Sequence, residues 1–208
     1  DPDTVTITVT SPDTTPPAPA EVTQIKVGPI TGGQVTVTGS PGSVEGGARV
    51  RVTNTRTGQS QLVLAATNGG FSAQLGAQFG DAMTVVVIDN AGNLSPEQTV
   101  IAVPDPLLIA PPVDQTVATT VADATTFLYT GPNAIQTGVA PETIQSQRAA
   151  VVRGTVLTQA GNPLPGVTIT VLNHPEFGQT LSRTDGRFDL VVNGGGLLTV
   201  DYQKAGYL

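Results

Sequence analysis

The sequence predicts an all-β protein made of two β-sandwich domains that are joined by a partly ordered, proline-rich connector. Valine and threonine are abundant while only 12% of the 208 residues are charged, which suits half-buried pleated strands. Short apolar runs recur about every ten residues between turn signals, without a helical period, in residues 21–104. Gly 24 and Pro 17 together stay below the share typical of disordered chains, so we expect a folded, turn-rich protein.

The charge balance and the cysteine count narrow the possible partners. Nine Lys+Arg against sixteen Asp+Glu give a net charge of −7, and no basic run is present to neutralise phosphates, so no nucleic-acid partner is expected. Zero cysteines exclude disulfides and thiolate metal sites. No stretch of the sequence approaches the roughly eighteen apolar residues of a membrane span.

The first twenty residues predict a domain boundary. Residues 3–10 alternate Val and Ile with Thr, and one strand cannot bury either of its faces alone, so residues 1–10 are expected to be the last strand of a preceding module. Residues 11–20, SPDTTPPAPA, predict a stiff proline-rich linker. We therefore expect a mature or internal piece of a longer protein.

Residues 21–104 predict an antiparallel sandwich of the immunoglobulin (Ig) type. Seven strand-like runs are separated by Gly, Asn and Pro turns: VTQIKV, QVTVTG, ARVRVTN, SQLVLAA, GGFSAQL, AMTVVVID and QTVIAV. Alternation of Arg with Val at 49–52 predicts one buried face, and the continuous run at 85–88 predicts a central strand. Phe71 and Phe79 are expected to anchor the core.

This first half also resembles a known family of modules. The segments GSVEGGARVRVTN, NGGFSAQL and GDAMTVVVIDNAGNLS, with DTTPPAPA before them, are similar to one repeat of the bacterial Ig-like modules that occur in tandem in large adhesins and surface proteins. The resemblance implies export and a role as a spacer or stalk.

Residues 105–150 predict a connector that packs on its neighbours. Val117, Val121, Ala124 and Leu128 follow Asp114 at helical spacing, so a short helix capped by Asp114 is expected. The apolar residues of the connector are too many for a solvated linker and are expected to pack on a neighbouring domain or on further chain: Leu107, Leu108, Ile109, Phe127, Leu128 and Tyr129.

Residues 151–208 predict a second, small β-sandwich, expected to be truncated at its C-terminus. Its strand-like runs are VVRGTVL, GVTITVLN, QTLSRTD, GRFDLVV and LLTVDYQK. The Asp-Gly pair at 185–186 predicts a two-residue type I′ hairpin. A domain of about sixty residues without disulfides or metal is marginally stable, so we expect it to depend on a partner surface.

The frame RGTVLTQAGNPLPGVTITV followed by TDGRFDL resembles the carboxypeptidase-regulatory (transthyretin-like) fold. The stretch LNHPEFGQTLSRTDGRFDLVVNGGG is in addition similar to the corresponding domain of teneurins and bacterial YD-repeat (Rhs-type) proteins. The resemblance rests on co-occurring residues, called the motif residues below: Asn173, His174, Phe177, Gly178, Ser182, Arg183, Asp185, Gly186, Phe188, Asp189 and Leu190.

In that family the domain closes the open end of a large shell of YD repeats. The resemblance thus implies a non-catalytic plug in a secreted or cell-surface bacterial protein, with the rest of the same polypeptide as partner and a toxic C-terminal segment as one possible cargo. The alternative function is a cell-surface adhesion or glycan-binding module, with a surface receptor or glycan as partner.

No residue pattern predicts catalysis. His174 with Glu176 lacks the third group that a metal or acid–base site requires. Asp185 and Asp189 on either side of Arg187 are expected to form a solvated charged face. No cofactor is expected; calcium is the one ion considered, with candidate ligands grouped around a turn: Asp81, Asp89, Asn90, Asn93 and Glu97.

Overall fold

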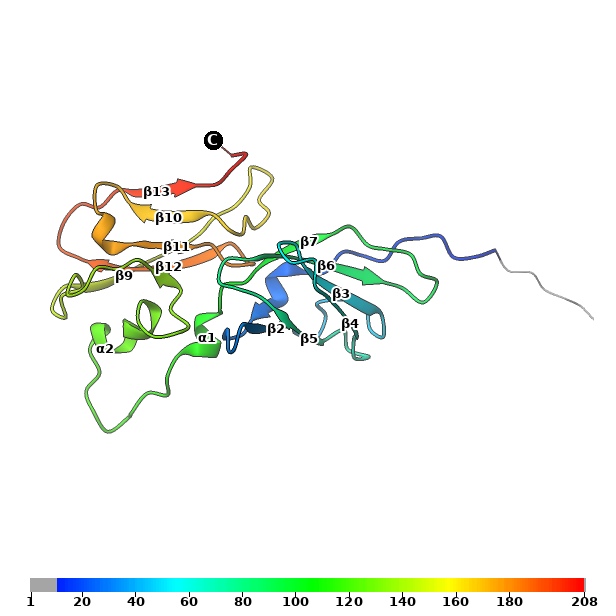
Figure 1. The fold of residues 1–208 in the computed structure, drawn as a ribbon, viewed down its shortest axis with the longest axis horizontal. Coiled ribbons are helices and arrows are strands. Elements are labelled where there is room, and N and C mark those ends of the chain that lie inside the picture. The colour runs from blue at the N-terminus through cyan, green and yellow to red at the C-terminus, as the bar shows by residue number, and fades with distance from the viewer. Residues whose placement is uncertain (1–10, 208) are drawn as a thin grey trace, which may run out of the picture.

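The computed structural model of the protein describes residues 11–207, so the strand expected at residues 3–10 lies outside the described part. Within it the chain forms two antiparallel β-sandwich domains, and the connector leads from the end of the first domain to a position below the second (Figure 1). The predicted all-β fold class is confirmed.

All seven strands expected in residues 21–104 are present. A three-stranded sheet has the order β1-β2-β5 and a four-stranded sheet the order β4-β3-β6-β7. The strands are β1 (Ile25–Val27), β2 (Gln34–Gly39), β3 (Arg49–Asn54), β4 (Ser60–Leu64), β5 (Phe71–Gly76), β6 (Ala82–Ile88) and β7 (Gln98–Ile101). The first is shorter than expected, because Val22–Gln24 form a 3₁₀ turn capped by the Glu21 carboxylate.

The core of the first domain follows the predicted alternation. Val50 and Val52 are fully buried while Arg49 is exposed. Strand β6 lies between β3 and β7, as its continuous apolar run predicts. Phe71 is buried in this core, but the expectation for Phe79 was wrong: its ring is only partly buried and packs on a separate cluster between the domains.

The connector is more ordered than its composition suggests. It contains α1 (Pro106–Ile109), α2 (Val121–Thr125), a 3₁₀ turn at Thr126–Leu128 and strand β8 (Gln136–Thr137). The helix expected after Asp114 starts later, because Thr120 and Asp123 form a reciprocal capping box at the start of α2. Asp114 instead accepts hydrogen bonds from Thr116 in a turn.

Part of the apolar connector packs as expected. Leu128 is buried, and Ile109, Phe127 and Tyr129 are partly buried against the cluster between the domains. Leu107 and Leu108 stay 76% and 48% exposed.

The second domain is a sandwich of unequal sheets. The larger has the order β13-β10-β11-β8 and the smaller contains only β12 and β9. The bounds are β9 (Ala149–Thr155), β10 (Thr168–Val171), β11 (Gln179–Leu181), β12 (Arg187–Asn193) and β13 (Val200–Gln203). The connector therefore supplies an edge strand of this domain, β8, and β9 begins two residues before the expected domain start at 151.

The type I′ hairpin expected at the Asp-Gly pair is wrong. Gly186 has a φ of +78°, whereas Asp185 is not among the residues of positive φ. Arg183 N donates to Arg187 O and Gly186 N donates to Arg183 O, the pattern of a tight turn followed by a left-handed glycine. The chain passes here from β11 in one sheet to β12 in the other, so the turn joins the two layers instead of two paired strands.

Candidate functional site: the motif residues and the domain junction

The first group of motif residues forms one loop between β10 and β11. Asn173 has a φ of 61°, the left-handed region that Asn tolerates. Gly178 has a φ of 64°, and a Cβ there would lie 2.1 Å from the Thr137 carbonyl oxygen. Only glycine therefore lets the loop close against β8.

His174 serves the same loop. Its Nδ1 lies 2.8 Å from Glu176 Oε1, and its ring is stacked at a tilt on Phe177, with centroids 5.6 Å apart. The hydrogen bond with His174 lowers the pKa of Glu176. Both side chains are 43% exposed and Phe177 is buried. The His174–Glu176 hydrogen bond therefore stabilises the loop that places Phe177 in the core of the second domain.

A second group of motif residues shapes the passage from β11 to β12. Ser182 is fully buried; its Oγ accepts from Val167 N at 2.8 Å and donates to Leu164 O at 2.7 Å. Asp185 accepts from Arg187 N at 3.0 Å inside the turn. Ser182 therefore satisfies two buried backbone groups.

Asp189 is buried, which corrects the expectation of a solvated charged face. One carboxylate oxygen, Oδ2, accepts a hydrogen bond from Arg183 at 2.8 Å, and the other, Oδ1, accepts one from Arg153. The side chain of Arg183 is 12% exposed and that of Arg153 is 68% exposed. The sequence pattern failed here because both faces of β12 are covered, so a polar position on this strand faces other residues instead of water.

The remaining motif residues build the core. Phe188 and Leu190 are buried in the second domain. The Phe188 ring crosses Gly154 of β9, where a Cβ would lie 2.6 Å from the ring, and meets Tyr202 of β13 edge-on at 5.8 Å. The motif thus encodes the loops, the buried ion pair and the core of this domain.

A buried glutamine of the connector closes one side of the second sandwich. Gln136 is 1% exposed. Its amide oxygen accepts from Val191 N at 2.7 Å, and its amide nitrogen donates to Val191 O at 2.9 Å and to Phe177 O at 2.7 Å. One side chain therefore satisfies backbone groups of β12 and of the motif loop. Nothing in the local pattern IQT distinguishes this residue from an exposed strand residue.

The two domains meet in an apolar cluster, here called the junction cluster. Its buried members come from the first domain, the connector and β12: Ile101, Val103, Leu128, Ile135 and Val191. The cluster shows that the domains are packed together and not only tethered.

Beside this cluster, one hydrogen bond joins the first domain to the second domain, and another joins the first domain to the connector. Ile101 N donates to Thr184 Oγ1 at 3.3 Å, and Ile30 N donates to Asn133 Oδ1 at 2.8 Å. Thr184 is buried within the turn that contains the motif residues Arg183 and Asp185. The motif turn therefore lies on the first domain, a contact that the sequence alone could not reveal.

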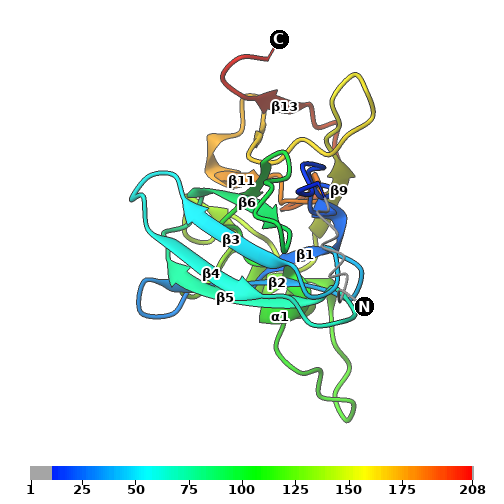
Figure 2. The same ribbon diagram turned by 90° about the vertical axis from the view of Figure 1, so that its right-hand side faces the viewer.

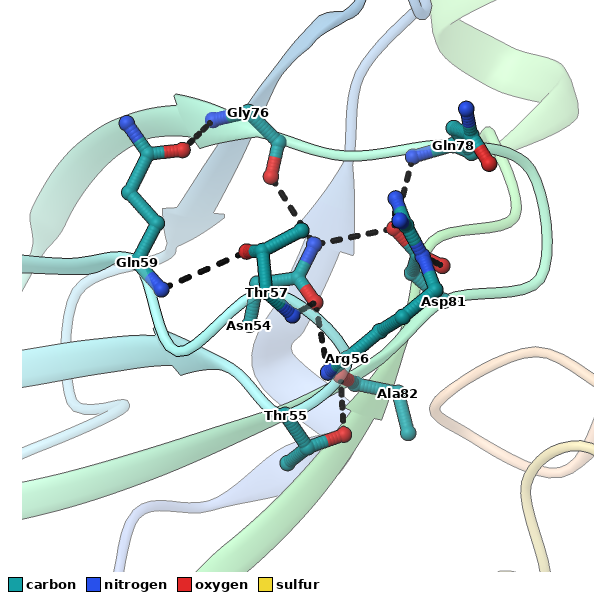
Figure 3. A network of polar contacts seen from close by, with 9 residues as sticks. All are labelled: Asn54, Thr55, Arg56, Thr57, Gln59, Gly76, Gln78, Asp81 and Ala82. Atoms are coloured by element: carbon teal, nitrogen blue, oxygen red, sulfur yellow. Dashed lines mark hydrogen bonds and ion pairs between the residues drawn. The ribbon is translucent and has the colours of Figure 1, made fainter.

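A polar network holds the loop of the first domain that faces the junction (Figure 3). Asp81 accepts from Arg56 at 2.6 and 2.8 Å, from Asn54 Nδ2 at 2.9 Å and from Gln78 N at 2.8 Å. These bonds, led by the one from Arg56, depress the pKa of Asp81 well below its usual range. The network fixes residues 76–82 and thereby presents Phe79 to the junction cluster.

Four of the calcium candidates, Asp89, Asn90, Asn93 and Glu97, lie between β6 and β7, whereas Asp81 precedes β6 and is bound to Arg56. Both carboxylate oxygens of Asp89 accept hydrogen bonds from Asn93, one from its backbone N and one from its Nδ2, each at 2.8 Å. These bonds lower the pKa of Asp89, with the Asn93 side chain as the largest cause. Among residues 11–207 no group of three or more His, Cys, Asp and Glu is placed to hold a metal ion. Calcium binding at Asp89, Asn90 and Asn93 stays a prediction.

No helix in the described part of the chain has the length and apolar character needed to cross a membrane.

The geometry defines a pair of packed β-sandwiches whose second member carries the motif as structural residues. Residues 144–208 match the family described as the teneurin TTR-like domain. Teneurin-3 of Mus musculus is 48% identical over 60 residues, which cover 29% of this chain and 2% of that protein. Teneurin-3 of Danio rerio is 34% identical over 109 residues, or 50% of this chain and 4% of that protein. The chain spans only a few per cent of these relatives, and its C-terminal part is teneurin-like.

Two solved adhesin structures also align with the chain. One, described as a Ca2+-stabilized adhesin that helps an Antarctic bacterium bind ice, gives a TM-score of 0.28 at 16% identity and covers 91% of this chain and 48% of that one. The other, a bacterial ice-binding adhesin, gives a TM-score of 0.27 at 19% identity and covers 85% of this chain and 54% of that one. At these scores the alignments support no statement about function.

Proposed function

We propose that this chain is a non-catalytic structural segment of a large secreted or cell-surface YD-repeat protein. The Ig-like domain is a spacer, and the second domain is a plug that closes one end of a shell formed by the rest of the same polypeptide. The observation that carries the proposal is the match of residues 144–208 to the teneurin TTR-like domain.

The roles of the motif residues support a structural function. Ser182, His174 and Asp189 have the side chains that catalysis uses, yet each is bonded to a neighbour in a loop, a turn or an ion pair. Ser182 and Asp189 are buried, so they stabilise the fold, because breaking their bonds would leave buried polar groups unsatisfied.

The packing of the domains supports the plug. The motif turn, the connector and the first domain share the junction cluster, so the second domain is held in a fixed orientation on its spacer. A domain that closes the end of a shell must be held in one place, and the packing against the first domain would hold it there.

The parent gene beyond the codon for Leu208 provides the first test. The proposal expects dozens of short Tyr-Asp-containing β repeats in the same reading frame, and a closed shell in electron micrographs of the purified parent protein. A frame that ends there, or that continues only into further Ig-like modules, would overturn the plug and leave a surface spacer. The sequence of the parent gene also tests two further parts of the proposal, namely that the protein is bacterial and that a toxic segment follows the repeats.

A further inference from the structure

The two sheets of the second domain are closed on one side and open on the other. On the closed side β8 and β11 lie against β12, and Gln136 bonds to the β12 backbone. On the other side stand the outer edges of β9 and β13, each the last strand of its sheet (Figure 2). The region between these two edges is called the open side below.

The backbone of β9 presents unpaired groups at the open side. Val191 uses both its N–H and its C=O for Gln136, so they point away from β9, and the opposed pair Val191–Val151 is one that exchanges no hydrogen bonds. By alternation the N–H and C=O groups of Val151, Arg153 and Thr155 point outward. No strand among residues 11–207 pairs with this edge.

The hydrophobic core is only partly covered at the open side. Ala150, Val152 and Val156 on one side and Leu198 and Val200 on the other are partly buried against the core of the second domain. A hollow of about 1570 Å³ lies at one end of the open side, bordered by the residues after β9 and by β13 with the residues after it. Tyr202 and Tyr207 on its border are 49% and 53% exposed.

Strand β9 has few of the devices that protect a free edge, although it carries one charged residue, Arg153, whose side chain is 68% exposed. The strand is seven residues long, contains no proline and no lysine, and shows no bulge in its register with β12. Long unprotected edges pair readily with another strand. The unpaired backbone groups therefore suit an extended segment, which can pair with them as a strand. The partly buried core beside them suits a segment with apolar side chains at alternate positions.

We propose that the outer edge of β9 accepts a β-strand from the remainder of the same polypeptide, which extends the two-stranded sheet and covers the open side. This inference rests on the proposed function, in which the chain is one segment of a longer protein. A strand in the same polypeptide is present at a high effective concentration, which favours it over a strand from a second copy.

Hydrogen exchange of the β9 amides tests the proposal. In residues 1–208 alone the inward amides of Ala150, Val152 and Gly154 are protected by β12, and the outward amides of Val151, Arg153 and Thr155 exchange rapidly. In the parent protein these outward amides are expected to exchange at least ten times more slowly. Equal exchange in the two proteins overturns the proposal, and so does protection that appears in residues 1–208 as their concentration rises, because the occupant is then a second copy.

A variant pair sharpens the test. Thr155→Pro removes an outward N–H at an exposed edge position, where proline is tolerated, and Thr155→Ala keeps that N–H. In the parent, T155P is expected to speed exchange at Val151 and Arg153 at least tenfold relative to T155A. If T155P also exposes Val152 in the isolated chain, the domain itself is disturbed, and the comparison of the two unmodified proteins decides. A parent without YD repeats but with protected outward amides would reject the plug and keep the added strand.

Discussion

Gln136 and Val191 belong to different sheets, yet the glutamine side chain pairs with the Val191 backbone as a neighbouring strand would. It accepts from Val191 N at 2.7 Å and donates to Val191 O at 2.9 Å. Because Gln136 lies in the connector, a residue outside the matched segment 144–208 satisfies the central part of β12.

Replacing this glutamine tests its structural role. Gln136→Leu leaves the N–H and C=O of Val191 without partners in a buried place, at a cost of about 2–4 kcal/mol in the free energy of unfolding. Urea unfolding followed by circular dichroism measures the loss. Gln145→Leu is the control, because the Gln145 side chain is exposed; equal stability of the two variants would contradict the role of Gln136.

The same relationship predicts where the second domain begins as a folding unit. A fragment of residues 144–208 lacks β8 and the Gln136 amide, so we expect it to be largely unfolded in water, whereas residues 120–208 keep both and fold. Amide dispersion in NMR spectra of the two fragments distinguishes these outcomes. A well-dispersed spectrum of the shorter fragment would show that the connector is dispensable.

The buried ion pair of β12 has unequal partners. Arg183→Ala removes the arginine that is 12% exposed and leaves the Asp189 carboxylate with weaker compensation, so roughly 3 kcal/mol of stability is expected to be lost. Arg153→Ala removes the arginine that is 68% exposed and is expected to cost less than about 1 kcal/mol. Chemical denaturation of both variants measures the difference, and a larger loss for Arg153→Ala would reverse the assignment.

Acid is expected to weaken the first domain through Asp81. The folded-state pKa of Asp81 is depressed, chiefly by the hydrogen bond from Arg56, so below the unfolded-state value of about 4 the unfolded chain takes up the proton first. The stabilisation is present above pH 5 and is lost progressively as the pH falls below about 4. Asp81→Asn should be less stable than the natural protein at pH 7 and should lose less on acidification; parallel pH curves would contradict this mechanism.

Coupling of the two domains depends on the junction cluster. Leu128 is 1% exposed within it, so Leu128→Ala is expected to cost about 2–5 kcal/mol and to split a single calorimetric transition into two. Leu107→Ala is the matched control because Leu107 is 76% exposed. Two transitions already present in the natural protein would show that the cluster does not couple unfolding.

Most of the fold could be predicted from the sequence because strand signals are local. Alternation at Arg49–Asn54 and the apolar run of β6 gave the correct strands, faces and central position. The errors arose where tertiary contacts override local pattern: Phe79 faces the junction, and the Asp-Gly turn changes sheets.

The candidate site was predictable only as a set of residues. The motif residues lie within the segment that matches the teneurin TTR-like domain, but the burial of Asp189 depends on cover over both faces of β12, and the contact of Thr184 depends on the first domain. Gln136 carried no signal, since its partners lie 41 and 55 residues away along the chain.

Residues 110–121 of the connector are exposed throughout and project away from both sandwiches, at the bottom of Figure 1. Nearby segments on either side are fixed by α1 and by the capped start of α2. An epitope tag or a fluorophore placed in this loop would therefore label the protein without disturbing either hydrophobic core.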